Sequence, residues 1–452
     1  MEMKQKKSYE RPLIKPLNTG MANKFGNIHS HRPTRDIDDI PVKRLLEDHG
    51  SPLFVISERN LRNTYREAYA AFSNRYPKVQ FAWSYKTNYL DAVCRIFHQE
   101  GSWAEVVSGF EYDKALHNGV PGEQILFNGP DKSDSDLLKA MSHRSMIHID
   151  HLDELYSLVR LARESGIRPR VAIRVNMDTG IYPTWDRFGF SFEAGQAHDA
   201  INKIIHSGEM DLIGLHCHIG TYILSTEAYA IAATKLGELA RFIHEKHGKT
   251  VRYIDLGGGF ASRNTLRGTY HQGVDVAPSF QDYAEKITTA LLNAGFRQGE
   301  LPMLILETGR ALVDDAGYLL STVLASKQLS DGRRATILDA GVHLLFTSFW
   351  YDHTVTTTTA SNGPGEDTVL YGPLCMNIDV VRESIRLPSL SKGDAVVIHR
   401  VGAYNMTQWM QFIHMRPAII LIDTEGKVHR IREKETLEDI LRMEHLPAHI
   451  QS

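Results

Sequence analysis

The segment MIHIDHLDELYSLVRLARESGIRPRVAIRVN, residues 146–176, contains the unit that decides the fold. It begins with a short β-branched run at residues 146–150 and ends with another at residues 170–176. Between these runs, apolar residues recur at helical spacing: Leu152, Leu155, Val159 and Ala162. Asp150 and Asp153 are candidates to cap this helix at its start. A strand, a helix and a second strand in this order predict two parallel strands joined by a crossover.

The same alternation extends from about Pro52 to Arg310. After Ser279, Tyr283, Ile287 and Leu291 lie on one helical face, and Asp282 completes a capping box. Eight or so such units in about 260 residues predict a (β/α)8 TIM barrel rather than an open sheet. The strand candidates are Leu53–Ser57, Gln80–Lys86, Ser102–Ser108, Ile125–Gly129, Met146–Asp150, Arg170–Asn176, Leu212–Gly220, Arg252–Gly259 and Met303–Arg310.

The pattern changes after about Ala311, where the apolar runs are short and β-rich. Thr424-Glu425-Gly426 separates two of them as a hairpin turn, and the polar stretch 356–367 is typical of a mobile loop. The other runs are Ala335–Asp339, Thr368–Leu370, Ala395–His399, Ala418–Ile422 and Val428–Ile431. We therefore expect an α/β barrel at 51–312 and a second, mostly antiparallel β domain at 313–452. We expect residues 1–50 to be partly disordered and partly joined to the β domain.

The composition excludes several classes of protein. Among the 452 residues, 42% are hydrophobic, which is too many for a disordered chain. The formal charge is only −3, which argues against nucleic-acid binding, and no apolar run approaches the ~20 residues of a membrane span. The charged opening MEMKQKKSYERPLIK has no apolar core of a secretory signal. Three cysteines without a C-x-x-C pair favour a reducing compartment, so we expect a cytoplasmic protein without a structural metal.

Chemistry in such a barrel is located at the carboxyl ends of the strands, and Lys86 lies at one of these ends. It follows the apolar run Phe81-Ala82-Trp83-Ser84-Tyr85. Desolvation there would lower its pKa and make the amine a nucleophile toward carbonyl groups. The alternative is a lysine whose stem lies along the rim while its charge stays in water.

A run of glycines, Gly257-Gly258-Gly259, follows the strand that ends at Leu256. Glycines after a strand let backbone N–H groups approach a phosphate, although a simple tight turn is the alternative. The run is not a Rossmann fingerprint, because G-x-G-x-x-G is absent. Arg310 is a candidate for a second phosphate contact.

His216 and His218 lie on the same face of a predicted strand. Such a pair can bind zinc, but the zinc-hydrolase pattern expects it on the first strand, and here it falls on about the seventh candidate. His218 could instead stack on an aromatic cofactor, or the pair could belong to the core. Glu307 ends another buried strand and needs a partner, which could be Arg310 or a pyridinium N–H.

Together these groups predict a site for pyridoxal 5'-phosphate. A lysine binds the cofactor, glycines and an arginine hold its phosphate, a histidine stacks on its ring, and a glutamate pairs with its ring nitrogen. The combination is far more specific than any of its members.

At this point the sequence resembles the alanine-racemase-fold (fold type III) family of pyridoxal-phosphate decarboxylases, and most closely the diaminopimelate and ornithine decarboxylases. The resemblance covers about residues 50–420. It rests on motifs that occur in the family's order: Ser84–Asn88, Glu105–Gly109, Arg187–Gly189, His216–Gly220, Gly257–Phe260, Glu307–Arg310, Gly372–Cys375 and Gly402–Tyr404.

The resemblance implies a role for each matching residue. Lys86 would bind the cofactor, His218 would stack on its ring and Glu307 would pair with the pyridine nitrogen. The other cofactor-binding residues, most of them at the phosphate, would be Glu105, Thr221, Gly257, Gly258, Gly259, Gly309, Arg310 and Tyr404. Cys375 would come from the partner subunit and protonate the carbanion, because the family works as homodimers with shared active sites.

The sequence departs from the family at the positions whose side chains bind the distal end of the substrate in the relatives. Diaminopimelate decarboxylases carry Cys-Glu-Ser, and here Cys375 is followed by Met376 and Asn377. Those enzymes also place an arginine soon after the Asp-Ala-Gly segment, and here none occurs before Arg382. The expected substrate residues are Asp339, Phe346, Met376 and Asp379. We expect an altered, more apolar distal pocket, as in a specialised relative from siderophore or antibiotic assembly.

Several alternatives stay open. One is the meso-diaminopimelate decarboxylase of lysine biosynthesis, and another is an amino-acid racemase of the same fold. Glu307 argues against the racemase, whose relatives place an arginine at the ring nitrogen and so weaken the electron sink. The others are a non-catalytic homologue that binds a partner enzyme, and a zinc hydrolase.

Overall fold

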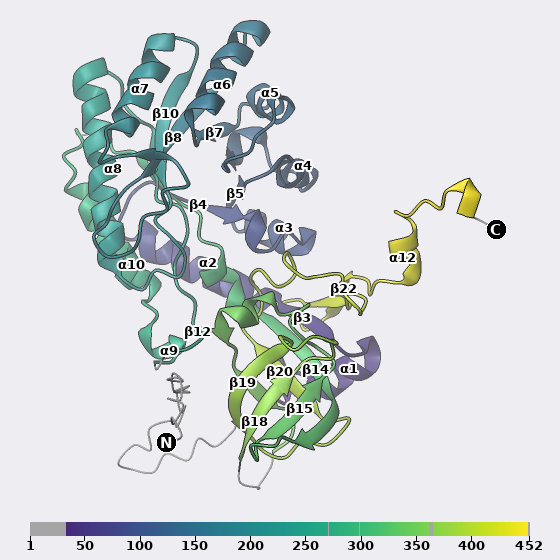
Figure 1. Cartoon of the computed structure of the whole chain (residues 1–452). Coiled ribbons are helices and arrows are strands. Elements are labelled where there is room, and N and C mark those ends of the chain that lie inside the picture. Colours follow the sequence, from purple (N-terminus) through teal and green to yellow (C-terminus); the bar gives the residue numbers. More distant parts are fainter. Residues whose placement is uncertain (1–32, 270, 298, 361–364, 451–452) are drawn as a thin grey trace, which may run out of the picture.

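Eight parallel strands close into a barrel in the computed structural model, which describes residues 33–269, 271–297, 299–360 and 365–450 (Figure 1). The strands in order around the barrel are β4 (Val79–Ser84), β5 (Trp103–Val106), β6 (Ile125–Phe127), β7 (Met146–Ile149), β8 (Arg170–Asn176), β10 (Asp211–Cys217), β11 (Tyr253–Asp255) and β13 (Met303–Leu306). Strand β13 pairs with β4 and closes the ring, and the short β9 (Phe190–Ser191) pairs in parallel with the end of β8. The predicted (β/α)8 barrel is confirmed.

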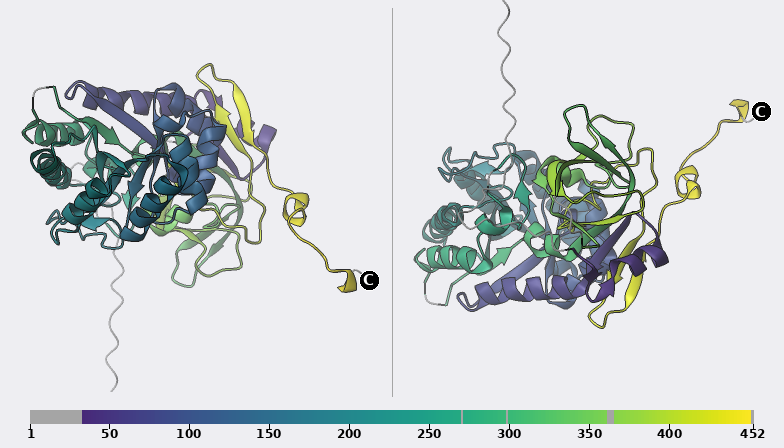
Figure 2. Two further views of the ribbon diagram at one scale, coloured as in Figure 1. Left: turned by 90° about the horizontal axis from the view of Figure 1, so that it is seen from above. Right: turned by 90° about the horizontal axis from the view of Figure 1, so that it is seen from below.

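Helices cover the outside of this barrel (Figures 1 and 2). They are α2 (Glu58–Ser73), α3 (Asp91–Gln99), α4 (Gly109–His117), α5 (Asp134–Ser142), α6 (Leu152–Ser165), α7 (Gln196–Ser207), α8 (Thr226–His247) and α10 (Phe280–Leu292). The predicted capping box of Ser279 and Asp282 is present at α10. The prediction for α6 was wrong in its cap, because the ring of His151 accepts from the Glu154 N–H in place of Asp150.

The first strand candidate belongs to the second domain, which corrects its assignment to the barrel. Strand β3 (Leu53–Ser57) pairs antiparallel with β14 and parallel with β21. All five of its residues are buried. A central strand of either sheet has this continuous apolar pattern, so periodicity alone did not distinguish them. His216 therefore lies on the sixth barrel strand rather than the seventh.

The second domain is a mostly antiparallel β structure beside the barrel, as predicted (Figure 1). Only β15–β18 and β3–β21 pair in parallel. The turn at Thr424–Gly426 joins two antiparallel strands, as expected. The remaining strands are β14 (Gly317–Gln328), β15 (Arg334–Leu338), β17 (Val355–Thr357), β18 (Glu366–Tyr371), β19 (Val380–Leu387), β20 (Ala395–His399), β21 (Ile419–Ile422) and β22 (Val428–Arg432).

Residues 33–50 pack on the β domain. They form the hairpin β1 (Asp36–Ile37) and β2 (Ile40–Pro41) and the helix α1 (Val42–His49), which shares an apolar cluster with β3, β14 and β20. The disorder expected for the start of the chain concerns residues 1–32, and the middle of the expected mobile loop is 361–364; both lie outside the described residues. Our domain boundaries, apart from β3, stay a proposal.

The two domains meet at the carboxyl end of β4. The Tyr404 N–H donates to the Thr87 carbonyl at 2.8 Å, and Thr407 Oγ1 donates to the Lys86 carbonyl at 3.0 Å. A second link is the antiparallel pair β12 (Thr265–Leu266) and β16 (Tyr351–Asp352). The β domain therefore helps to hold the segment that carries Lys86.

The remaining helices are short: α9 (Gly273–Val276), α11 (Arg310–Val313) and α12 (Leu437–Leu441). Helix α12 and the C-terminal segment after it extend away from both domains (Figure 2). Within the described ranges, no helix has the length and apolar character needed to cross a bilayer.

Candidate active site

Lys86 lies in the turn directly after β4 and pairs with a fully buried carboxylate. Its Nζ donates to Glu105 Oε2 at 2.6 Å, and the side chain is 38% exposed, whereas that of Glu105 is 0% exposed. The neighbouring Ser84 hydroxyl donates to the same oxygen. The amine is thus accessible to a ligand, while the buried carboxylate of Glu105 compensates its charge.

The pKa of Lys86 moves in the direction opposite to the predicted one. Burial lowers it, but the charge of Glu105, together with Tyr404 and Glu307, outweighs burial and raises the pKa above its ordinary value. The prediction of a lowered pKa was therefore wrong for this free amine. It considered the apolar strand but not the carboxylate on the neighbouring strand.

Asn128, at the end of β6, bridges two buried carboxylates. Its Nδ2 donates to Glu307 Oε1 at 2.6 Å and to Glu105 Oε1 at 3.0 Å. Lys86, Glu105, Asn128 and Glu307 therefore form one continuous chain of hydrogen bonds across the carboxyl ends of β4, β5, β6 and β13. Two carboxylates this close would repel each other without such a shared donor.

A second buried lysine, Lys132, shows what a structural lysine looks like here. Its side chain is 0% exposed, and Nζ donates to Glu154 Oε1 and to the carbonyls of Gly129 and His148. All three N–H groups are used, so this amine has no free donor and no access to a ligand. Lys86 is the better candidate for covalent chemistry.

The glycine run after β11 brings backbone segments into close contact. Gly257 and Gly259 have φ of +65° and +101°, and a Cβ on Gly258 would lie 2.5 Å from the Glu307 carbonyl oxygen. A Cβ on Gly309 would overlap Thr87 Oγ1. A side chain at Gly258 or Gly309 would therefore collide with the neighbouring segment.

Arg310 supplies a buried cation with unused donors next to these glycines. It is 7% exposed, and its Nε and Nη1 have no hydrogen-bond partner within the described part of the chain. Its guanidinium lies 4.7 Å from the Tyr404 ring centroid and 4.8 Å from that of Tyr351. The nearest carboxylate oxygen, on Asp314, is 3.8 Å away. Unused buried donors of this kind fit an anion such as a phosphate.

His218 is held as a neutral ring at the barrel mouth. Its Nδ1 accepts from the Gly258 N–H at 3.2 Å, and its ring lies edge-on to Trp185 at 5.4 Å. Burial and the nearby cations Arg174 and Lys86 lower its pKa to about 3. The ring is therefore uncharged at neutral pH, as stacking on an aromatic cofactor requires.

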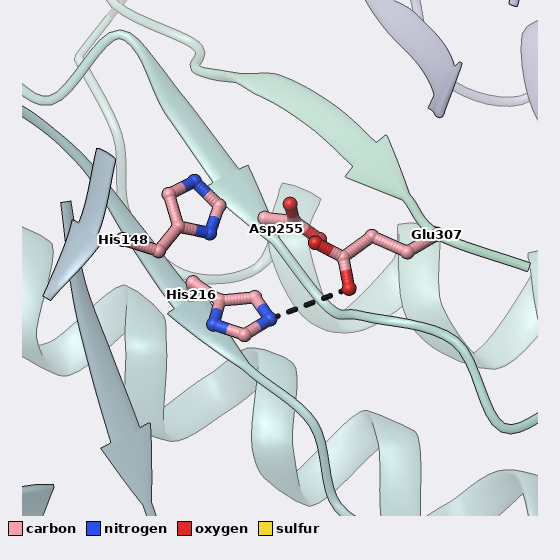
Figure 3. A group of neighbouring side chains, drawn as sticks. All are labelled: His148, His216, Asp255 and Glu307. Atoms are coloured by element: carbon pink, nitrogen blue, oxygen red, sulfur yellow. Dashed lines mark ion pairs between the residues drawn. The ribbon is translucent and has the colours of Figure 1, made fainter. Parts of the chain in front are cut away.

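The expected His216–His218 pair does not form one site. Strand β10 ends at Cys217, and His216 lies below, in a buried cluster with His148, Asp255 and Glu307 (Figure 3). The ligand atoms of these four side chains lie within 4.8 Å of one another. The cluster contains Glu307, the predicted partner of a ring nitrogen.

These groups fit pyridoxal phosphate, and comparison with known proteins agrees. Residues 62–314 match the family described as pyridoxal-dependent decarboxylase, pyridoxal binding domain. The chain belongs to this family. Its cofactor is pyridoxal 5'-phosphate, and its reaction class is the decarboxylation of an amino acid, as predicted.

The relatives are similar over nearly the whole decarboxylase chain. The diaminopimelate decarboxylase of Methanothermobacter thermautotrophicus is 31% identical, over 90% of this chain and 94% of its own. That of Bacillus subtilis is 29% identical, over 92% and 96%. The crystal structure of the M. jannaschii diaminopimelate decarboxylase matches with a TM-score of 0.84 at 27% identity, over 93% and 99%.

Other predicted site residues take no part in the hydrogen-bond chain of Lys86, Glu105, Asn128 and Glu307. Cys375 is exposed on the loop between β18 and β19 and takes no part in the hydrogen bonds of Lys86. Thr221 is exposed on the loop after β10. The Asp379 carboxylate accepts from the N–H groups of Val342 and Leu374, both at 2.8 Å, so it orders the Cys375 loop.

The other expected substrate residues also contact their own domain. Asp339 Oδ1 accepts from Ser321 Oγ at 2.6 Å and from the Thr322 N–H at 2.9 Å. Phe346 is half-buried and packs edge-on against Phe349 and Trp350, and Met376 is half-buried. Asp339 and Asp379 thus have clear structural partners, and their role toward a substrate stays an expectation.

Sequence reasoning missed the residues that link the site together. Asn128, His148 and Asp255 received no role. Arg174, whose Nη1 lies 3.5 Å from Asp150 Oδ1 and whose guanidinium stacks on Phe188, was missed likewise. All four lie at or near carboxyl ends of barrel strands, which was the available signal.

Proposed function

We propose that this enzyme removes the α-carboxylate of an amino acid that differs from meso-diaminopimelate at its distal end, as in siderophore or antibiotic assembly. The observation that carries the proposal is the lack of positive charge in segments 339–350 and 374–379, which we call the wall next to Cys375. In the described segments 339–350 and 374–379 the ionisable side chains other than Cys375 are Asp339, His343 and Asp379. None of them is a cation at neutral pH, because burial, with a smaller contribution from His414, lowers the pKa of His343 to about 4.

The arginine that follows this wall is already engaged. Arg382 Nη1 donates to the His353 carbonyl at 2.7 Å, and Nε donates to the Ser384 carbonyl at 3.2 Å. Its Nε also lies 3.5 Å from Asp352 Oδ1. Recruiting Arg382 for a substrate carboxylate would break these contacts. A distal carboxylate would therefore be desolvated here without a partner, which is costly.

The apolar groups of the wall favour a different distal end. Phe346 and Met376 are half-buried and offer carbon and sulfur surface. Such surface suits a substrate whose distal end is uncharged or larger.

The residues of the barrel have separate tasks in this proposal. Bound pyridoxal phosphate supplies the electron sink for the electrons that CO2 leaves behind. Lys86 would hold the cofactor, Arg310 and the end of the glycine run at Gly259 would hold its phosphate, and Glu307 would pair with its ring nitrogen. The N–H groups of Gly257 and Gly258 are already engaged, by Asp255 Oδ1 and His218 Nδ1. His218, which the Gly258 N–H holds in place, would cover one face of the ring and shield it from water.

We also propose that two copies share each active site. Cys375 is exposed, and its loop is ordered by Asp379 rather than by the barrel. In this arrangement the partner subunit's thiol delivers the proton that replaces CO2. The three unpaired cysteines also agree with a cytoplasmic enzyme.

Kinetics on meso-diaminopimelate test the substrate proposal. We expect a kcat/KM below ~10⁴ M⁻¹s⁻¹, the lower end for typical enzymes on their own substrates, and faster CO2 release from amino acids with uncharged or conjugated distal ends. The matched variant Met376→Glu with Asn377→Ser restores the Cys-Glu-Ser of the diaminopimelate enzymes. It should improve turnover of meso-diaminopimelate and weaken turnover of the preferred substrate.

The second candidate is meso-diaminopimelate decarboxylase itself. It is favoured by the names of the relatives, among them an M. jannaschii enzyme solved with L-lysine, which matches with a TM-score of 0.84 at 28% identity. A kcat/KM for meso-diaminopimelate at or above ~10⁴ M⁻¹s⁻¹ would establish this candidate and overturn the altered pocket.

A further inference from the structure

Asp255 and Glu307 end the neighbouring strands β11 and β13, and their carboxyl groups meet inside the barrel (Figure 3). Asp255 is 0% exposed and Glu307 is 5% exposed. A carboxyl oxygen of Asp255 lies within 4.8 Å of one of Glu307, and the two groups lie side by side (Figure 3). A hydrogen bond between two carboxyl groups needs a proton on one of them, and two buried carboxylates in contact cannot both be ionised.

The surrounding donors indicate which of the two is charged. Glu307 accepts from Asn128 Nδ2 at 2.6 Å and lies 3.5 Å from His216 Nε2. Asp255 accepts only the Gly257 N–H, at 2.8 Å, in the described part of the chain, and its Oδ2 has no donor there. Each carboxyl group accepts one of these hydrogen bonds, and Glu307 has His216 Nε2 as a further polar neighbour, so the negative charge is better placed on Glu307 and the proton on Asp255.

Among the described residues, no lysine or arginine forms an ion pair with Asp255. Lys86 and Arg174, two cations of this site, are paired with Glu105 and Asp150. Burial keeps the pKa of both His148 and His216 well below the ordinary value, so both rings are neutral. Burial and then the charge of Glu307 raise the pKa of Asp255 well above its usual range.

We propose that Asp255 is a positioning residue that carries the proton shared with Glu307, and that it thereby keeps Glu307 singly charged and directed toward the cofactor ring. The Oδ2–H of Asp255 donates to the Glu307 carboxylate, while Oδ1 accepts from Gly257 at the start of the glycine run. One side chain therefore links the orientation of Glu307 to that of the glycine run. This inference rests on the role proposed for Glu307.

A bound metal ion is the competing explanation for the same four side chains. Tetrahedral zinc has bonds of about 2.0–2.1 Å, which places its ligands about 3.4 Å apart. Here the ligand atoms are separated by up to 4.8 Å, and His148 Nε2 is engaged with the Tyr253 hydroxyl at 2.8 Å. A metal would also take an oxygen of Glu307, whose carboxylate accepts from Asn128 and lies 3.5 Å from His216. A proton explains the contact without moving any side chain.

The experiment compares Asp255→Asn with Asp255→Ala in the full-length holoenzyme. An asparagine amide is neutral and of the same shape as the protonated acid, so it can donate to Glu307 and accept from the Gly257 N–H. We expect Asp255→Asn to bind pyridoxal phosphate within about threefold of the wild type, and Asp255→Ala to bind it at least about tenfold more weakly, because a donor to a charged group is lost. Cofactor dissociation is followed by absorbance and fluorescence.

Infrared difference spectroscopy reads the proton directly and needs only the asparagine variant. The wild type should show the C=O stretch of a protonated carboxyl group, shifted in D2O and absent in Asp255→Asn. The band should persist from pH 6 to pH 9. The ionisable groups around it are His148 on β7, Arg174 on β8, His216 and Cys217 on β10, Tyr253 on β11, Glu105 on β5 and Glu307 on β13. None of them should titrate the band away in this range.

Three results would overturn the proposal: no such band, an asparagine variant as weak as the alanine variant, or stoichiometric metal in the purified protein that is lost in His148→Ala. Failure of the role proposed for Glu307 is distinguishable from these. It would appear as a normal decarboxylation rate in Glu307→Gln, together with the expected Asp255 band in the wild type.

Discussion

At the carboxyl end of the barrel, Lys86, Glu105, Asn128 and Glu307 satisfy one another in a buried chain of hydrogen bonds. The loop that carries Cys375 is different, because its cysteine is exposed and the loop is held by the Asp379 carboxylate and by its own backbone hydrogen bonds. Both regions matched motifs of the same family. This difference is the reason why we propose that the loop acts on a second chain.

Removing the lysine of the barrel end should have the largest effect. In Lys86→Ala we expect loss of covalently held cofactor and of activity by several orders of magnitude, more than about 4 kcal/mol in the barrier. Borohydride reduction of the wild type followed by peptide mapping should label Lys86. Lys132 is the internal control, since its three N–H groups are engaged and it should stay unlabelled. A label on any other lysine contradicts the assignment.

Neutralising Glu307 tests whether the network serves the cofactor ring. Glu307→Gln removes the charge that favours a protonated ring nitrogen, and each unit lost from the pKa of that nitrogen is worth about 1.4 kcal/mol. The decarboxylation rate should fall by about two to three orders of magnitude, while the cofactor stays bound through Lys86 and Arg310. Absorbance of the bound cofactor and single-turnover rates measure the two effects. A near-normal rate would mean that the carboxylate is only structural.

Several carboxylates lie close together at the barrel end, and their repulsion should make the free energy of unfolding depend on pH. Burial and the nearby Glu105 raise the pKa of Glu111 to about 7, from an ordinary 4.5. The folded state therefore binds this proton more tightly, and the wild type loses stability as the pH rises from about 4.5 to about 7, by at most about 3 kcal/mol. Glu111→Gln keeps an acceptor for the Val107 N–H and should lack this decline.

Urea unfolding at pH 5 and pH 8 measures the difference. The matched control is Glu366→Gln on the β domain, which removes a more exposed partner of Arg334 and should leave the decline in place. A decline of equal size in Glu111→Gln and in the wild type would place the titrating group elsewhere.

Mixing two inactive variants tests whether the Cys375 loop acts on the active site of a second chain. Lys86→Ala and Cys375→Ala chains should each be inactive, and a heterodimer would hold one site with both lesions and one with neither. Random exchange of subunits should restore about one quarter of the wild-type activity. No recovery, despite exchange proven by mass spectrometry of differently tagged chains, would place Cys375 in its own chain's site.

Prediction from the sequence succeeded where spacing along the chain carries the information. The positions of Lys86 and Glu307 at strand ends followed from helical and strand periods, and the hairpin at Thr424–Gly426 followed from its turn residues. It failed for β3, because an apolar run of five residues looks the same in either sheet. It failed for the pKa of Lys86, because the decisive charge is on a residue 19 positions away in the chain.

The sequence by itself determined the barrel, the cofactor and the class of reaction, since these depend on periodicity and on residue types that occur in a set order. Only the tertiary structure decided how the polar groups of the site are paired. Asn128 bridges Glu105 and Glu307, Asp255 meets Glu307, and the arginine beyond the Cys375 loop is engaged with its own domain. Hydrogen bonds and charges act over a few ångströms in space, and neighbouring strands bring together residues that lie far apart in the chain.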